Sequence, residues 1–231
     1  MSHRGTPGSH QRKQIEKTRL LLGEGQDEER FLRAMLRHLG RSDVQVMSTG
    51  GKTGLRAFLR ALLDDPLWPK LESLLLIRDA DFGGDASRES ASVSALRSLS
   101  FLLGELGLPV PPRHGTFVSA PTARTEGPLR VGVFVLPDGT SEGMLEDLCL
   151  AAVTGDAMMP CLEAYLRCID ERRALVGSAP IARNQLPKAR VHAFLASRPE
   201  PDRRVGEAAE AGIWPWEADA LRPLVDFVNA A

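Results

Sequence analysis

The stretch Leu74-Leu75-Leu76-Ile77-Arg78-Asp79-Ala80-Asp81 decides the fold of this chain. An apolar run that leads into two carboxylates predicts a buried parallel strand with Asp79 and Asp81 together at its carboxyl end. Side chains two residues apart in a strand lie on the same face. Two neighbouring carboxylates repel each other unless a proton or a cation lies between them, and a hard cation such as Mg²⁺ prefers oxygen ligands. The alternative is a strand that ends in a solvated acidic turn.

Further strands and helices are predicted on both sides of this stretch. From the apolar pattern we expect strands at 18–23, 43–47 and 130–136 and helices at 27–39, 55–63, 87–106 and 144–153. Strands that alternate with helices imply a parallel sheet, and the ligand crevice of such a sheet lies outside the carboxyl ends of its strands. The sequence therefore predicts an α/β fold with a mostly parallel central sheet flanked by helices.

Acidic residues follow three of these strands at the points where the strands end. Glu24 comes directly after the first strand, and Glu28 lies one helical turn further on. Glu146 and Asp147 occupy the first turn of the helix after the last strand. Since the carboxyl ends of parallel strands share one edge of the sheet, we expect these residues to converge with the aspartate pair of the central strand.

A carboxylate cluster of this kind can hold one or two Mg²⁺ or Mn²⁺ ions, which polarise a phosphoryl oxygen and lower the pKa of a bound water. Phosphodiester cleavage or transfer is the reaction class that most needs these effects. A lysine would neutralise charge that develops on the phosphate, and Lys52 or Lys188 could supply it. The Gly-Lys-Thr around Lys52 is not a phosphate loop of the NTPase type, because Val46 stands where that motif needs glycine.

Composition limits the kinds of partner and compartment. The 231 residues are 43% hydrophobic, which allows a sizeable core, and 29 Lys and Arg against 30 Asp and Glu give a net charge of -1. There is no overall basic field, so nucleic-acid binding must come from a local patch. Cys149, Cys161 and Cys168 lack the spacing of a zinc site and predict reduced, packed thiols in a cytoplasmic protein. We expect neither a transmembrane helix nor a signal peptide, because no suitable apolar run is present.

Three parts follow from the order of these features. Residues 1–17 predict a disordered basic tail, with a nucleic-acid arm as the alternative. Residues 18–157 form the predicted α/β domain, and residues 158–231 form a helical extension packed on the same core. Within this extension we interpret Trp214-Pro215-Trp216 as a hydrophobic plug over the core rather than a ligand-stacking platform.

Three motifs in this order carry a family resemblance. Leu22-Gly23-Glu24-Gly25-Gln26-Asp27-Glu28, Arg78-Asp79-Ala80-Asp81 and Gly143-Met144-Leu145-Glu146-Asp147-Leu148 resemble the Toprim pattern. In that family a glutamate follows the first strand and an Asp-x-Asp follows a later one. The version here is similar to stand-alone Toprim-like proteins of the DUF3226 type and to the Toprim half of OLD-family nucleases. The motifs cover roughly residues 18–150, and residues 188–227 also resemble the helical tail of the DUF3226 group.

The resemblance implies a Toprim-like, Rossmann-like fold and a metal-dependent nuclease with Mg²⁺ or Mn²⁺ as cofactor. Glu24 matches the Toprim glutamate, a metal-site residue proposed to act as general acid or base. Asp79 and Asp81 match the metal-binding Asp-x-Asp, and Glu28 and Glu146 match further acidic positions.

Four more residues complete the expected site. Asp147 is added to the metal-binding set because it adjoins Glu146. Lys188 matches a downstream catalytic lysine of the OLD-type nucleases. Lys52 and Arg78 are the residues that we expect to contact nucleic acid, with DNA favoured over RNA and no membrane involved.

Other functions stay open at this point. The chain shows no ATPase half, and its single tyrosine, Tyr165, lies on a predicted helix face rather than beside a DNA-binding domain. A catalytically inactive Toprim-like interaction module is one alternative. Metal-dependent glycosyl or phosphoryl transfer through the Asp-x-Asp is another, although glycosyl transfer would not require Glu24 and Glu146 to converge. A homodimer and a partner protein are both compatible with the sequence.

Overall fold

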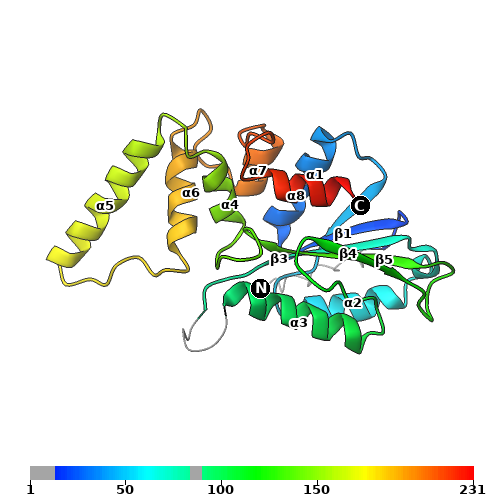
Figure 1. Ribbon diagram of the computed structural model, residues 1–231. Coiled ribbons are helices and arrows are strands. Elements are labelled where there is room, and N and C mark those ends of the chain that lie inside the picture. The colour runs from blue at the N-terminus through cyan, green and yellow to red at the C-terminus, as the bar shows by residue number, and fades with distance from the viewer. Residues whose placement is uncertain (1–13, 84–89) are drawn as a thin grey trace, which may run out of the picture.

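The computed structural model describes residues 14–83 and 90–231, and it contains one five-stranded sheet in the order β2-β1-β3-β5-β4 (Figure 1). The strands are β1 (Arg19–Gly23), β2 (Val44–Ser48), β3 (Ser73–Asp79), β4 (Thr116–Ala120) and β5 (Leu129–Leu136). All neighbouring strands are parallel except β4, which runs antiparallel to β5. The predicted α/β fold with a mostly parallel sheet is confirmed.

Helices cover both faces of the sheet (Figure 1). They are α1 (Gln26–His38), α2 (Leu55–Leu63), α3 (Ala91–Glu105), α4 (Leu145–Ala152), α5 (Met159–Leu175), α6 (Leu186–Ala196), α7 (Val205–Glu210) and α8 (Arg222–Asn229), with a short 3-10 turn at Trp68–Lys70. Helices α2 and α3 pack on one face, and α1, α4 and the C-terminal helices pack on the other. No described helix has the length and apolar character needed to cross a membrane.

The central strand β3 explains why the opening stretch is so apolar. Its residues alternate between the two cores, with Leu74 and Leu76 in one and Leu75 and Ile77 in the other. Because both faces of the strand are covered, every one of these side chains is buried and the usual polar alternation is absent.

Asp81 differs from the prediction, because β3 ends at Asp79 and does not extend to Asp81. Asp81 has a φ of +62°, in the left-handed region, so the chain turns there instead of continuing along the strand. Its backbone N–H donates to the Gly143 oxygen over 2.8 Å, and the Gly143 N–H donates back over 3.0 Å. This bridge joins the loop after β3 to the loop after β5.

Three other expectations need correction. Strand β4 was not expected, because it is a partly exposed edge strand without a buried apolar run. In α3 the apolar spacing predicts an inward face made of Val93, Leu96, Leu99, Leu103 and Leu106, but Val93 is 48% exposed, and Ala95, Leu99 and Leu103 are buried. Cys161 and Cys168 are exposed rather than packed, and only Cys149 of the three free thiols is buried.

The structure describes the N-terminal segment from Gln14 onward. Ile15 is buried, and its backbone N–H donates to an Asp65 carboxylate oxygen over 3.0 Å. Residues 14–17 of the expected tail therefore contact the folded chain. Its remaining part, residues 1–13, lies outside the described residues.

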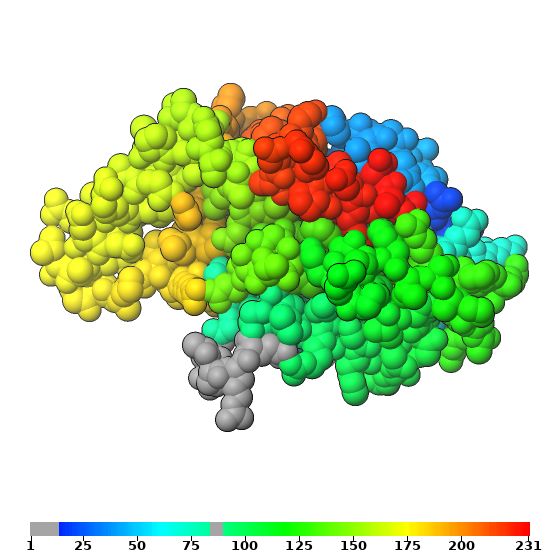
Figure 2. All heavy atoms as spheres, viewed as in Figure 1, coloured from blue at the N-terminus to red at the C-terminus, as the bar shows by residue number. Residues whose placement is uncertain are grey.

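The C-terminal helices belong to the core that also contains α1 and β1. Trp214 is buried, donates its ring N–H to the Val205 oxygen over 3.0 Å and stacks on Phe194, as expected for a plug. By contrast, α5 lies at one end of the molecule, where it packs on α6 (Figure 2). The division between residues 18–157 and 158–231 stays a prediction.

The close approach of α7 to α1 gives a stability test. A Cβ atom at Gly206 would lie 2.6 Å from the Arg30 Cβ and 2.7 Å from the Asp27 oxygen. We expect Gly206→Ala to lower the free energy of unfolding by about 1–3 kcal/mol, because backbone atoms must move apart. At Gly104 in α3 the nearest atom would be 3.9 Å away. Gly104→Ala should instead add roughly 0.5–1 kcal/mol, the usual helical gain. Urea denaturation of both variants measures the difference, and equal effects would contradict the packing argument.

Candidate functional site

Three neighbouring parallel strands, β1, β3 and β5, bring the predicted acidic residues to one edge of the sheet. Glu24 lies in the turn between β1 and α1, Asp79 is the last residue of β3, and Glu146 lies in the first turn of α4. The Leu145 N–H donates to an Asp79 carboxylate oxygen over 3.0 Å. Asp79 thereby ties the end of the central strand to the start of α4, whose positive dipole end favours a carboxylate.

Asp79 is the residue on which the other carboxylates converge. Burial raises the pKa of the Asp79 carboxyl well above its usual range. The negative charges of Glu28, Glu24, Glu146 and Asp81 raise this pKa further, in that order. The structure therefore gathers five carboxyl groups, contributed by three separate segments of the chain, around the end of β3.

Glu24 has an incompletely satisfied side chain. One of its carboxylate oxygens is buried and has no hydrogen-bond partner among the described residues. Burial raises the pKa of Glu24, and the charges of Asp81 and Glu28 add to this effect, while Arg78 and Lys52 oppose it. A buried, unpartnered carboxylate oxygen is a free ligand position for a proton or a cation.

Glu146 faces the helical extension. Burial raises its pKa, whereas the charge of Lys188 lowers it. Lys188 is exposed and lies in the first turn of α6. The structure thus brings the charge of Lys188 close to Glu146, although the two residues are 42 positions apart in the chain, and the catalytic role of Lys188 stays a prediction.

Two of the predicted ligands also cap helices. A Glu28 carboxylate oxygen accepts from the Gly25 N–H over 2.9 Å, and an Asp147 oxygen accepts from the Met144 N–H over 2.9 Å. Burial raises the pKa of Asp147, with Arg190 as the opposing charge. Asp147 therefore fixes the start of α4, and Glu146 is the residue of this pair that interacts with Asp79.

The two expected nucleic-acid contacts face the carboxylates in this structure. The Lys52 ammonium forms an ion pair with Asp81. Arg78 donates to the Ser98 hydroxyl over 3.2 Å, and its charge acts on Glu24. Both cations therefore reduce the repulsion inside the acidic cluster.

Sequence reasoning missed Arg183, which precedes α6. Its guanidinium forms an ion pair with Glu142 and lies 5.8 Å from the centre of the Phe82 ring. These contacts join the helical extension to the loops that follow β3 and β5. No local pattern marks Arg183, because its partners lie 41 and 101 residues away.

The chemistry of the cluster suits a hard divalent cation, because its ligand atoms are carboxylate oxygens and one of them lacks a partner. Within residues 14–83 and 90–231, however, no three His, Cys, Asp or Glu side chains stand in an arrangement that would hold a metal ion as they are. A bound cation would require side-chain rotations that draw the carboxylates together. The role of these residues as metal ligands stays a prediction.

The raised pKa values give a stability test in EDTA. Glu24, Asp79 and Glu146 have raised pKa values in the folded state, so the folded protein binds more protons than the unfolded chain above about pH 4. The free energy of unfolding should therefore fall as the pH rises through these values. Asp79→Asn keeps an oxygen that can accept from Leu145 and should raise stability at pH 8 by roughly 0.5–2 kcal/mol.

Denaturation curves between pH 5 and pH 8 measure this effect. In Asp79→Asn the fall in stability should be shallower than in the unmodified protein. The exposed Asp202→Asn serves as control and should leave the pH dependence unchanged. If Asp79→Asn lost as much stability between pH 5 and pH 8 as the unmodified protein, the raised pKa of Asp79 would be contradicted.

The chain was compared with curated proteins, solved structures and protein families. No curated protein matches the chain. Among solved structures, the chain is similar to the C-terminal region of the Xanthomonas campestris pv. campestris OLD protein, with 14% identity, a TM-score of 0.42 and coverage of 94% of this chain and 96% of that chain. The model of a family described as "Protein of unknown function (DUF3226)" matches residues 18–231. Since this match spans nearly the whole sequence, the chain belongs to the DUF3226 family.

Proposed function

We propose that this protein is a metal-dependent nuclease that acts on nucleic acid through a Toprim-like carboxylate cluster. The observation that carries the proposal is the half-buried Asp79 carboxyl at the end of β3, which accepts from the Leu145 N–H and feels the charges of four other carboxylates. Maintaining this much repulsion costs stability, which is typical of sites kept for a bound cation or for proton transfer. The resemblance of the three motifs to the Toprim pattern supports the same reading.

Glu24, Asp79, Asp81, Glu28 and Glu146 are the residues that would hold Mg²⁺ or Mn²⁺. When bound, the metal ion supplies Lewis-acid polarisation of a phosphoryl oxygen and a more acidic water. Glu24 has a raised pKa and a free buried oxygen, so it suits the role of general acid or base.

Two lysines supply positive charge at opposite sides of the cluster. Lys188 acts on Glu146 from α6, and Lys52 is paired with Asp81. If Asp81 helped to hold a cation, Lys52 would lose this ion pair and could contact a phosphate group. Lys188 would stabilise negative charge that develops on the phosphate during cleavage.

The second candidate is a catalytically inactive interaction module of the same fold. It is favoured by the absence, among the described residues, of three side chains already arranged around a metal position. Glycosyl transfer through the Asp-x-Asp is less well supported, because that reaction does not require Glu24 and Glu146 to lie near Asp79.

Metal binding separates these two candidates. Mn²⁺ at about 100 times its dissociation constant should stabilise the protein by roughly 2.7 kcal/mol and raise its melting temperature. Asp79→Asn should lose this stabilisation, whereas Glu171→Gln, on the exposed side of α5, should keep it. Thermal unfolding with and without Mn²⁺, together with calorimetric titration, measures the effect. An unmodified protein that shows no divalent binding below millimolar concentration would favour the inactive module.

Cleavage tests the catalytic assignment. With Mg²⁺ or Mn²⁺ the purified protein should nick or degrade DNA, and EDTA should stop the reaction. We expect Glu24→Gln and Asp79→Asn to reduce the rate by about 100-fold or more, because each removes a charge needed in the transition state. Plasmid nicking is compared with that of Glu171→Gln, which should be unaffected. Activity retained by both site variants, after contaminants are excluded, would overturn the site.

A further inference from the structure

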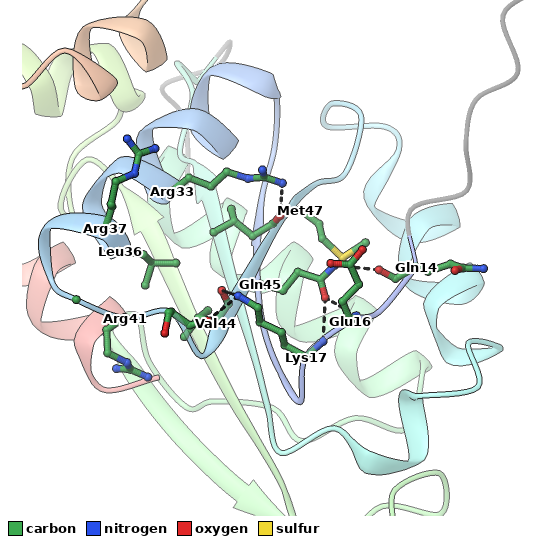
Figure 3. Close-up of a pocket in the computed structure, with 13 residues that line it drawn as sticks. Gln14, Glu16, Lys17, Arg33, Leu36, Arg37, Arg41, Val44, Gln45 and Met47 are labelled. Carbon is green, nitrogen blue, oxygen red and sulfur yellow. Dashed lines mark hydrogen bonds between the residues drawn. The ribbon is translucent and has the colours of Figure 1, made fainter.

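A groove at the edge of the sheet is the strongest site outside the carboxylate cluster. This edge groove lies between α1 and the edge strand β2 and is bordered by residues 14–17 (Figure 3). Its volume is about 550 Å³. In Figure 3, Arg33 and Arg37 reach it from α1, while Lys17 and Gln45 lie on the other side.

The exposed edge of β2 is already hydrogen-bonded by side chains. The Val44 oxygen accepts from the Lys17 ammonium over 3.3 Å, and the Val46 oxygen accepts from the Arg33 guanidinium over 3.2 Å. The Ser48 N–H donates to Glu29 over 2.9 Å. Cationic side chains on an edge strand discourage the addition of another strand. The edge groove is therefore poorly suited to an extended peptide.

The charges that line the groove favour an anion. Its lining includes four cations, Lys17, Arg33, Arg37 and Arg41, and one carboxylate, Glu16. Arg33 and Arg41 are paired with acidic side chains.

The other two cations carry the argument. The Lys17 ammonium donates to two backbone oxygens, of Ser42 over 2.6 Å and of Val44. The exposed guanidinium of Arg37 has no hydrogen-bond or ion-pair partner in the part of the chain that the structure describes. Two cations on one groove thus lack a carboxylate. In a chain with a net charge of -1, this is the kind of local patch that nucleic-acid binding requires.

We propose that the edge groove binds the phosphate groups of a polynucleotide strand and guides this strand to the carboxylate cluster. Arg33 and Arg37 lie about one turn apart in α1, roughly 6 Å at a helical rise of about 1.5 Å per residue, and Arg41 follows after the helix has ended at His38. Phosphates of one strand in a duplex are spaced by about 3.4 Å along the axis, so the separation of Arg33 and Arg37 spans about two of these intervals, and Arg41 adds a third cation beyond the helix end. A mononucleotide carries its phosphate charge at one end and would leave part of the row without a partner.

The groove and the carboxylate cluster are continuous along β2. Glu29 contacts both Arg33 and the Ser48 N–H. The next residue, Thr49, donates from its hydroxyl to the backbone carbonyl oxygen of Glu24 over 3.3 Å, and the Gly51 N–H donates to the same carbonyl oxygen over 2.8 Å. Lys52 follows in this loop and pairs with Asp81. A polynucleotide that leaves the groove at Arg33 therefore reaches the carboxylate cluster along the loop after β2, which carries one more cation, Lys52.

Binding of the polynucleotide is measured without cleavage. Only the idea that the edge groove guides the polynucleotide to the carboxylate cluster rests on the proposed nuclease function. Fluorescence anisotropy with a labelled 20-nucleotide single-stranded DNA in EDTA reports the dissociation constant at several salt concentrations. Arg37→Gln should weaken binding by about three- to tenfold and reduce the salt slope by roughly 0.7, as expected for one lost phosphate contact. Lys17→Gln combined with Arg37→Gln should reduce both further.

Matched controls separate the possible outcomes. The exposed Arg124 follows β4 at the opposite edge of the sheet, so Arg124→Gln should bind within twofold of the unmodified protein. Glu24→Gln should keep binding even if it loses cleavage. Equal binding by Arg37→Gln and Arg124→Gln would contradict polynucleotide binding in the edge groove, but it would not contradict the proposed nuclease function. Complete displacement of the strand by an equimolar mononucleotide or by inorganic phosphate would also contradict polynucleotide binding, in favour of a small-anion site.

Discussion

Repulsion among carboxylates at the end of β3 is the constraint on which the arrangement of this molecule depends. Asp79 is fixed by its place in a strand buried on both faces and by the Leu145 N–H at the start of α4. Neither contact removes the negative charges around it. Three cations reduce the repulsion between these carboxylates: Lys52 in the loop after β2, Arg78 in β3 and Lys188 in α6. The helical extension is thus part of the electrostatic balance of the sheet edge.

Much of this fold could be read from the sequence because the decisive signals are local. The apolar run of β3, the acidic first turns of α1 and α4 and the helix at Leu55–Leu63 depend on neighbouring residues and were predicted nearly residue by residue. The convergence of Glu24, Asp79 and Glu146 followed from parallel topology, since strands that run the same way end at the same edge.

The remaining features depend on contacts between distant residues. Asp81 leaves the strand because its backbone pairs with Gly143, and this could not be inferred from a strand pattern. Strand β4 is defined by its partner β5 rather than by its own composition. Arg183 and the edge groove combine residues that carry no motif, and whether an arginine is neutralised depends on which acidic residue the fold brings beside it.

The distribution of charge along α1 has a consequence for direction. Its first turn carries Asp27, Glu28 and Glu29, and its last turn carries Arg37 and His38. Each set stabilises the helix through the macrodipole. The same order gives this flank of the protein a negative pole at the carboxylates and a positive pole at the edge groove, only 13 residues of helix apart. A flexible polyanion lying along α1 would be attracted at the end of the helix and repelled at its start. The charge order that stabilises the helix therefore also gives this surface an electrostatic polarity.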